Sequence, residues 1–212
     1  RHGRVWTAPK GSQVTLSILI RPTAESIERL GTMPLVSGLA IIDALTATAA
    51  RHPDATDKLT PQLKWPNDVL IDGRKLCGIL AEAVSLGPEP AVVIGLGLNV
   101  SITTEELPVP HATSLDLEAP GIEIDRAQLT ADVLLALHHR INQWVDADPQ
   151  LMADYRAVCS SIGADVKVLL PGDEELLGTV RDVADDGRLV VVDKQGAEHI
   201  LAAGDVTHLR LQ

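Results

Sequence analysis

Residues 64–80 read KWPNDVLIDGRKLCGIL, and this stretch decides the fold. Short apolar runs lie on both sides of its Pro-Asn-Asp, which is ordinary turn chemistry, so residues 62–65 and 69–71 are predicted to be two short strands. A longer apolar run follows at residues 75–84, and another at 91–100. The turn signal between these two longer runs predicts a hairpin of central strands.

The segments around this stretch predict further elements. Apolar residues alternate with polar ones over residues 13–20, the period of a half-buried strand. Residues 34–50 carry apolar side chains at helical spacing, and so do residues 125–144, where Asp125 has the form of an N-cap. A further helix is predicted to run to about Val158.

The character of the sequence changes after Ser160. Five short β-like runs follow, separated by turn signals such as Asp-Asp-Gly at residues 185–187. Strands so short, at such regular spacing, are typical of a small β-barrel. We therefore predict an α+β protein in which residues 1–159 form a mixed β-sheet flanked by helices and residues 160–212 form the barrel.

Composition limits the class of protein. With 45% hydrophobic residues among 212, the chain can bury a core, and a core without Phe must be built from aliphatic side chains. A net charge of −11 with scattered basic residues argues against a general nucleic-acid binder, which needs clustered Lys and Arg. Cys77 and Cys159 occur in unrelated contexts and suggest no metal site. Because no segment approaches twenty uninterrupted apolar residues and no signal peptide opens the chain, we expect a cytoplasmic protein with no membrane partner.

The basic opening of the chain is a candidate phosphate site. Arg1 and Arg4 lie on a glycine-containing loop, where guanidinium groups offer forked donors and glycine lets the backbone approach a phosphate closely. The indole of Trp6 is suited to stacking on a nucleobase. A frayed, solvated terminus explains the same residues without a ligand.

Polar groups and glycines near the predicted strands give three further candidates. Asn67 and Asp68 supply an amide and a carboxylate for a ribose hydroxyl or for a magnesium ion, which prefers oxygen ligands. Lys75 begins a buried strand that also holds Gly78. Two glycines within residues 92–100 suggest close approach by a ligand or by another backbone. Turn chemistry, solvation of a strand end and tight strand packing are the respective alternative explanations.

The order of these signals is more specific than any one of them. RHGRVW at residues 1–6, KWPNDV at 64–69, GRKLCGIL at 73–80 and GLGLNV at 95–100 follow the order of the family patterns GRGRxGRxW, KWPND, K(L/I)xGIL and G(I/L)GxN. The chain to about Val158 thus resembles the catalytic domain of biotin protein ligases, and the terminal barrel resembles that family's SH3-like domain. Lipoate ligases share the fold but not the pairing of KWPND with RKLxGIL.

The resemblance implies an enzyme whose catalytic domain is similar in fold to class II aminoacyl-tRNA synthetases. In this family, biotin and ATP give biotinoyl-AMP and pyrophosphate. A lysine of a biotin carboxyl carrier protein domain of an acyl-CoA carboxylase then attacks the adenylate and releases AMP. Magnesium is expected with ATP, and the resemblance admits a homodimer. Lys75 matches the family's essential lysine, and Arg1 and Arg4 match arginines of a loop over the adenylate, which gives three predicted catalytic residues.

The resemblance also implies binding positions. Besides Lys75 and Arg1, biotin is expected to lie against four positions that wall its ring system: Gly78, Leu80, Gly95 and Gly97. ATP is expected near residues of three separate motifs: Arg4, Trp6 (beside the adenine), Asn67, Asp68 and Asn99. Asp68 is also the expected magnesium ligand. Residues 101–115 take the place of a loop that orders with the adenine, but their sequence departs from the better-known members, so no contacts are assigned there.

Other functions stay open at this stage. The first half of the arginine loop, and the upstream strand and helix that complete the family's biotin pocket, do not occur in the sequence, so we expect the working protein to contain more residues. Some family members carry a DNA-binding helix-turn-helix and act as repressors, which makes a biotinoyl-AMP sensor one alternative. A lipoate ligase, which would need a narrower apolar tunnel, is another. Lys75 and the loop arginines favour catalysis of biotin transfer.

Overall fold

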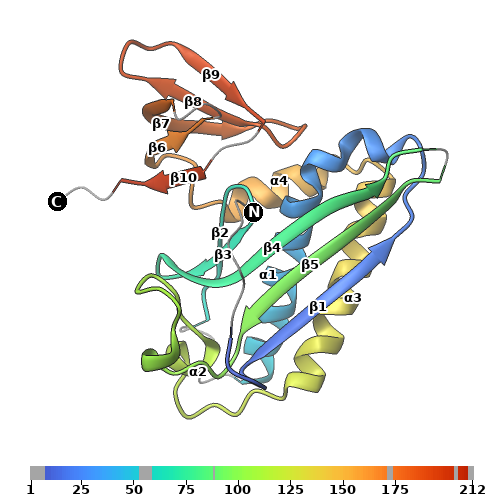
Figure 1. The fold of residues 1–212 in the computed structure, drawn as a ribbon, viewed down its shortest axis with the longest axis vertical. Helices are drawn as coiled ribbons and strands as arrows, with labels where there is room; N and C mark the ends of the chain where they lie inside the picture. The colour runs from blue at the N-terminus through green and yellow to red at the C-terminus, as the bar shows by residue number, and fades with distance from the viewer. Residues whose placement is uncertain (1–7, 53–58, 88, 171–173, 203–204, 210–212) are drawn as a thin grey trace.

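Two five-stranded sheets organise the structure (Figure 1). The computed structural model describes residues 8–209, except 53–58, 88, 171–173 and 203–204. The strand order is β1-β5-β4-β3-β2 in the first sheet and β10-β6-β7-β8-β9 in the second. The predicted α+β class is confirmed.

The first sheet is antiparallel between all of its named strands, where a mixed sheet was expected. Asp72 and Gly73 join β3 to β4, and their φ angles of 49° and 72° are the left-handed conformations that a two-residue hairpin turn requires. Such short connections allow only antiparallel pairing. The strands of this sheet are β1 (Gln13–Ile20), β2 (Gln62–Lys64), β3 (Asp68–Ile71), β4 (Arg74–Ser85) and β5 (Ala91–Asn99).

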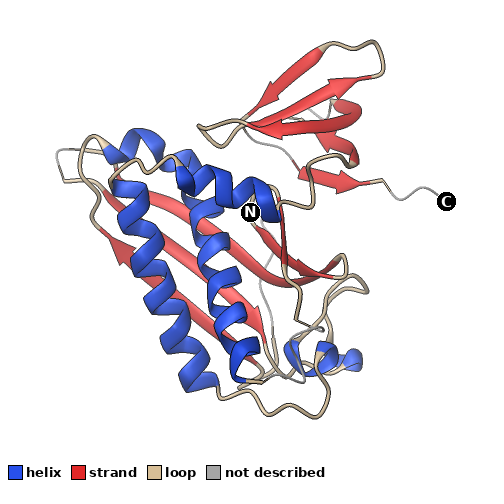
Figure 2. Cartoon of the chain, turned by 180° about the vertical axis from the view of Figure 1, so that it is seen from behind, coloured by secondary structure: helices blue, strands red, loops and turns tan. Residues whose placement is uncertain are grey.

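Helices cover one face of the first sheet (Figure 2). The stretch Ser26–Arg51 is long and apolar enough to cross a membrane by length and composition, but 72% of its apolar window is buried inside the fold, as in the core helix of a soluble protein. It packs against the sheet and against α3. The helices within the described residues are the 3-10 turns η1 (Ser26–Thr32) and η3 (Thr104–Glu106), and α1 (Met33–Arg51), α2 (Leu115–Glu118), α3 (Arg126–Val145) and α4 (Gln150–Val158).

The predicted start and core face of α3 are confirmed. The Asp125 side chain accepts hydrogen bonds from the backbone N–H groups of Ala127 (2.8 Å) and Gln128 (3.2 Å), which satisfies two donors that the first helical turn leaves unpaired. Trp144 is 1% exposed, and its indole N–H donates to Oγ1 of Thr32 at 2.9 Å. The tryptophan is therefore a core residue, as its spacing predicted.

The second sheet contains the five strands predicted after Ser160 (Figure 1), and apolar side chains of its strands are buried. The placement of a domain boundary between residues 159 and 160 stays a prediction. The strands are β6 (Asp165–Leu169), β7 (Glu175–Val183), β8 (Leu189–Asp193), β9 (Glu198–Leu201) and β10 (Asp205–His208).

Trp65 connects the two sheets. Its side chain is 2% exposed, and its indole N–H donates to the carbonyl oxygen of Gly187 in the β7–β8 turn at 2.8 Å. Its backbone N–H donates to the hydroxyl of Ser161 at 3.1 Å. Because Trp65 belongs to the KWPND stretch, its bond to Gly187 fixes one end of that stretch against the second sheet.

Candidate functional site

Most of the predicted site residues lie on the side of the first sheet opposite α1 and α3, called the open face below. Figure 1 shows the sheet from this side, with the helices behind it. Residues directly opposite each other on antiparallel strands point to the same face. On β1, Thr15 and Ser17 are exposed whereas Val14 is buried toward the helices, so Thr15, Ser17 and their partners in register lie on the open face.

Glycines form the floor of the open face, called the glycine floor below. Gly78 on β4 lies opposite Gly97 on β5, and Leu80 lies opposite Gly95. Among the residues that the structure describes, a Cβ built at Gly95 would meet only the carbonyl oxygen of Leu80, at 3.8 Å, which is an ordinary contact. Tight packing within the sheet therefore does not explain the glycine at position 95. A bare backbone there leaves room for a flat group to lie on the sheet.

Lys75 and Asp68 form an ion pair at the end of the glycine floor. Nζ of Lys75 lies 2.6 Å from Oδ1 of Asp68, and the two side chains are 27% and 20% exposed. Asp68 lies opposite Gly78, which places the pair beside the floor. Lys75 is therefore more than a solvated strand end. A partly shielded ammonium group in this position attracts an anionic part of any ligand on the floor.

The turn that carries Asp68 is held against β4. The side-chain amide of Asn67 donates to the carbonyl oxygen of Ile79 at 2.6 Å, and the N–H of Ile79 donates back to the carbonyl oxygen of Asn67 at 3.1 Å. The peptide bond between Trp65 and Pro66 is cis. Asn67 thus fixes the backbone next to Asp68, and its predicted contact with ATP stays a prediction.

The loop after β5 folds back along the start of β4. The N–H of Lys75 donates to the carbonyl oxygen of His111 at 2.7 Å, and the N–H of Thr113 donates to the carbonyl oxygen of Lys75 at 2.9 Å. The carboxylate of Glu118 accepts from Nη2 of Arg74 at 2.8 Å and from Oγ1 of Thr113. These contacts hold the backbone of Lys75, at the start of β4, against the loop.

Asn99 anchors the same loop from the other side. Its side chain is 3% exposed, its amide donates to the carbonyl oxygen of Thr113 at 2.7 Å, and its oxygen accepts from Nε2 of Gln13 at 2.6 Å. These bonds join β1, β5 and the loop. The predicted place of Asn99 near the nucleotide stays a prediction.

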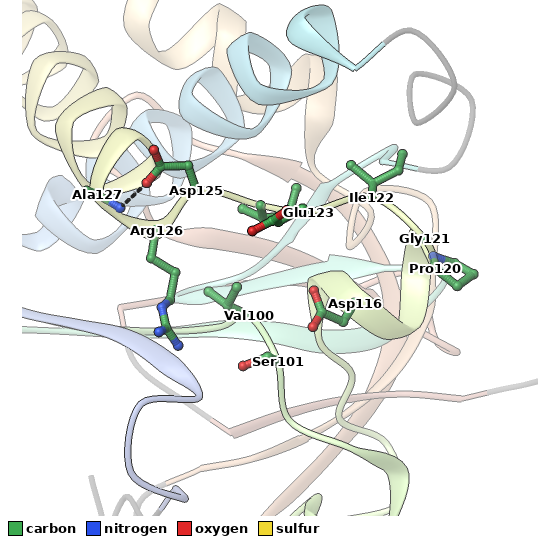
Figure 3. A pocket seen from close by; sticks show the side chains of 11 residues that line it. Val100, Ser101, Asp116, Pro120, Gly121, Ile122, Glu123, Asp125, Arg126 and Ala127 are labelled. Atoms are coloured by element: carbon green, nitrogen blue, oxygen red, sulfur yellow. Dashed lines mark hydrogen bonds between the residues drawn. The ribbon is translucent and has the colours of Figure 1, made fainter.

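A surface pocket of about 970 Å³ lies beyond the end of β5 and at the start of α3 (Figure 3). Val100, Ser101, Asp116 and Arg126 belong to its lining, and none of the predicted biotin or ATP residues within the described part of the chain does. Burial raises the pKa of the Asp116 carboxyl, and the charge of Arg126 counteracts this shift. We place the candidate site on the open face, because the ion pair and the glycine floor occur there together.

The structure brings together the predicted residues that it describes. They lie on β3, β4 and β5 or at the ends of these strands: Asn67, Asp68, Lys75, Gly78, Leu80, Gly95, Gly97 and Asn99. Arg1, Arg4 and Trp6 lie outside the described residues. The ligand contacts of all of these residues stay predictions.

Sequence reasoning missed three residues beside Lys75: Arg74, Thr113 and Glu118. Arg74 and Glu118 are 44 positions apart, and Glu118 belongs to a helix of only four residues. No periodicity or motif spans such a distance, so only the folded chain shows that they meet.

Comparison with protein families assigns both parts of the chain. Residues 1–99 match the Biotin/lipoate A/B protein ligase family, and residues 161–209 match the Biotin protein ligase C terminal domain. The two matches occur in the order that the sequence motifs predicted.

Two curated relatives extend the match over nearly the whole chain. A Biotin--[acetyl-CoA-carboxylase] ligase of Mycobacterium tuberculosis is 43% identical over 210 residues, which cover 99% of this chain and 74% of that protein. The Bifunctional ligase/repressor BirA of Escherichia coli is 28% identical over 193 residues, which cover 90% of this chain and 57% of that protein.

Solved structures show the same fold. A biotin protein ligase from Aquifex aeolicus in complex with biotin and ATP has a TM-score of 0.78 at 24% identity, covering 100% of this chain and 84% of that chain. A biotin protein ligase from Leishmania major in complex with biotinyl-5-AMP has a TM-score of 0.58 at 23% identity, covering 95% and 82%. Together with the 43% identity to the mycobacterial ligase, these matches show that the chain belongs to the biotin protein ligase family.

Proposed function

We propose that this protein uses ATP to activate biotin as biotinoyl-AMP and transfers the biotinyl group to a lysine of a biotin carboxyl carrier protein domain in an acyl-CoA carboxylase. The observation that carries the proposal is the Lys75–Asp68 ion pair beside the glycine floor, in a chain of this family. A flat bicyclic ring over Gly95 and Gly97 would direct the biotin carboxylate toward Nζ of Lys75.

The first step joins two anions. A carboxylate oxygen of biotin forms a bond to the α-phosphorus of ATP, and the bond from that phosphorus to the pyrophosphate oxygen breaks. The ammonium group of Lys75 opposes the repulsion between the reactants and stabilises the charge that develops in the transition state. Asp68 holds this ammonium group in place at 2.6 Å.

The second step transfers the acyl group. The neutral ε-amine of the carrier lysine attacks the acyl carbon of biotinoyl-AMP, the bond from that carbon to the AMP oxygen breaks, and the amine loses a proton. The departing phosphate carries negative charge, so the same ammonium group of Lys75 stabilises it. One residue thus serves both steps.

Magnesium fits this site as a partner of ATP. The described residues contain no group of three or more His, Cys, Asp or Glu side chains that could hold a metal ion by themselves. Mg²⁺ usually binds one or two carboxylates together with substrate phosphates, and Asp68 supplies such a carboxylate. The ion would neutralise phosphate charge when bound.

The proposal includes residues outside the described part of the chain. Arg1 and Arg4 would contact the adenylate, Arg1 also the biotin, and Trp6 would lie beside the adenine. Leu80, 40% exposed on the open face, would cover one side of the biotin ring system. We further propose that the enzyme acts in the cytoplasm and that two copies of it can associate as a homodimer.

The test is the mass of a purified biotin carrier domain after incubation with the full-length protein, biotin and magnesium-ATP. A gain of one biotinyl group that disappears without ATP supports the proposal, and the Lys75→Ala protein should leave the carrier unmodified. Retention of biotinoyl-AMP with no transfer would point to a sensor instead. If the carrier were modified with lipoate but not with biotin, the substrate would be lipoate and not the proposed biotin.

A further inference from the structure

A buried carboxylate joins the start of β4 to the loop beside it. The side chain of Glu118 is 5% exposed, and its Oε2 accepts from Nη2 of Arg74 at 2.8 Å. Its Oε1 accepts from Oγ1 of Thr113. A carboxylate removed from water must be paired and hydrogen-bonded to be tolerated, and here each oxygen has a partner.

The same loop is bonded to the backbone of Lys75. Thr113 donates its N–H to the carbonyl oxygen of Lys75 at 2.9 Å, while its hydroxyl donates to Glu118. Arg74, which binds the other oxygen of Glu118, directly precedes Lys75 in the chain. Lys75, Thr113, Glu118 and Arg74 therefore close a ring of contacts around the base of the lysine side chain. We call these contacts the Glu118 clamp.

Stability alone does not account for the Glu118 clamp. The side chain of Arg74 is 42% exposed, and an ion pair that water reaches contributes about 0–1 kcal/mol. Burying the carboxylate of Glu118 works against folding. A fold that needed only to fill this position would be served as well by an apolar side chain.

Resting on the function proposed above, we infer that Glu118 and Thr113 are positioning residues that hold the backbone of Lys75 and thereby aim its ammonium group at the reacting carboxylate and phosphate. Neither residue needs to touch a substrate. Asn99 reinforces the arrangement, because its amide holds the carbonyl oxygen of Thr113 at 2.7 Å. A displacement of about 1 Å at a reacting group lowers a rate on the order of 100-fold, so a small loosening of this backbone is measurable.

The test compares variants of the clamp in the full-length protein. Thr113→Val keeps the shape of the side chain and removes its hydroxyl, and Thr113→Ser keeps the hydroxyl. Glu118→Gln replaces the carboxylate by an amide. Thr179→Val is the matched control, because Oγ1 of Thr179 also donates to a carboxylate, Oδ1 of Asp165 at 2.6 Å, on the second sheet and away from Lys75.

Biotin-dependent pyrophosphate release gives kcat and KM, and thermal unfolding gives Tm for each variant. Thr113→Val and Glu118→Gln should lower kcat by about 10-fold to 100-fold, with a KM for biotin within about twofold of wild type. Thr113→Ser should restore most of kcat, and Thr179→Val should leave it unchanged. Amide exchange at Lys75 should be faster in Thr113→Val than in wild type or Thr179→Val. If Glu118→Gln does not fold, the comparison of Thr113→Val with Thr113→Ser still tests the inference.

The inference is overturned if Thr113→Val keeps the wild-type kcat, or if its loss of activity only follows its loss of folded protein. A wild-type protein that releases no pyrophosphate with biotin would instead overturn the proposed function. In that event, amide exchange at Lys75 still decides whether Thr113 holds this strand, since unchanged exchange would refute the clamp itself.

Discussion

Replacing Gly187 by alanine should weaken the contact between the two sheets. Gly187 has a φ of +82°, and a Cβ there would lie 2.9 Å from Cγ2 of Thr32 and 3.5 Å from Cδ2 of Leu35, at the start of α1. The turn would have to move away from the helix. Because the carbonyl oxygen of Gly187 accepts the indole N–H of Trp65, that hydrogen bond would lengthen as well.

The magnitude follows from two terms. A left-handed backbone costs a residue with a Cβ about 1–2 kcal/mol. Forcing an extra carbon into a filled space costs about 1–3 kcal/mol. The free energy of unfolding should therefore fall by about 2–5 kcal/mol in Gly187→Ala. Gly196→Ala is the control, because Gly196 has a φ of +83° and its Cβ would meet nothing within 4 Å.

Urea unfolding followed by tryptophan fluorescence measures both variants, since Trp65 is buried where the sheets meet. In Gly196→Ala, the free energy of unfolding should fall only by the cost of the left-handed backbone, so the free energies of unfolding of the two variants should differ by about 1–3 kcal/mol. Equal free energies of unfolding would refute the reasoning, because they would show that the β7–β8 turn does not press against α1. A difference of the opposite sign would refute it as well.

Three further predictions concern the candidate site and the buried thiol. Lys75→Ala should fold normally by circular dichroism but release pyrophosphate at least about 100-fold more slowly, because it lacks the cation that stabilises the developing charge. A wild-type rate in this variant would exclude a catalytic role for Lys75. Gly95→Ala should keep its Tm, since among the described residues the new Cβ meets only the Leu80 carbonyl oxygen, at 3.8 Å. It should bind biotin about tenfold more weakly in calorimetry, and an unchanged affinity would show that biotin does not bind on the glycine floor. Burial raises the pKa of the Cys77 thiol from 9.0 to about 12, so a chromogenic disulfide should modify it only after unfolding. As pH rises, the thiol ionises in the unfolded protein before it ionises in the folded protein. The contribution of Cys77 to the free energy of unfolding is therefore complete below pH 9.0 and declines toward pH 12. Rapid modification of the native protein would contradict the burial of this thiol.

Local patterns were sufficient to predict most of the elements. The alternation over residues 13–20 and the helical spacing of α3 each show that one face of the element is buried. Both patterns can be recognised from residues that are close together in the sequence. The hairpin of β4 and β5 was predicted, but the antiparallel pairing of all the named strands of the first sheet was not, because an alternating pattern does not show the direction in which β1 pairs with β5. The Asp72-Gly73 turn alone shows that β3 and β4 pair as a hairpin.

The candidate site was predictable only in part. Motif order identified Lys75 and Asp68, and the structure adds that they form an ion pair. The role of Glu118 could not be predicted, since its partners Arg74 and Thr113 come from separate segments that meet only after folding. The space for a Cβ at Gly95 also required the structure, because a sequence does not distinguish a glycine that packs tightly from one that leaves room for a ligand.

The attachment of Trp65 to the second sheet sets an order of events during protein synthesis. Trp65 bonds to Ser161 and Gly187, which follow it by 96 and 122 residues. At about 10 residues per second, a ribosome makes Gly187 about 12 s after Trp65. Throughout that interval, the KWPND stretch of the nascent chain has no acceptor from the second sheet for its indole N–H. A chain released before Gly187 would leave this indole N–H without its acceptor, and it would lack the bond that attaches the KWPND stretch to the second sheet.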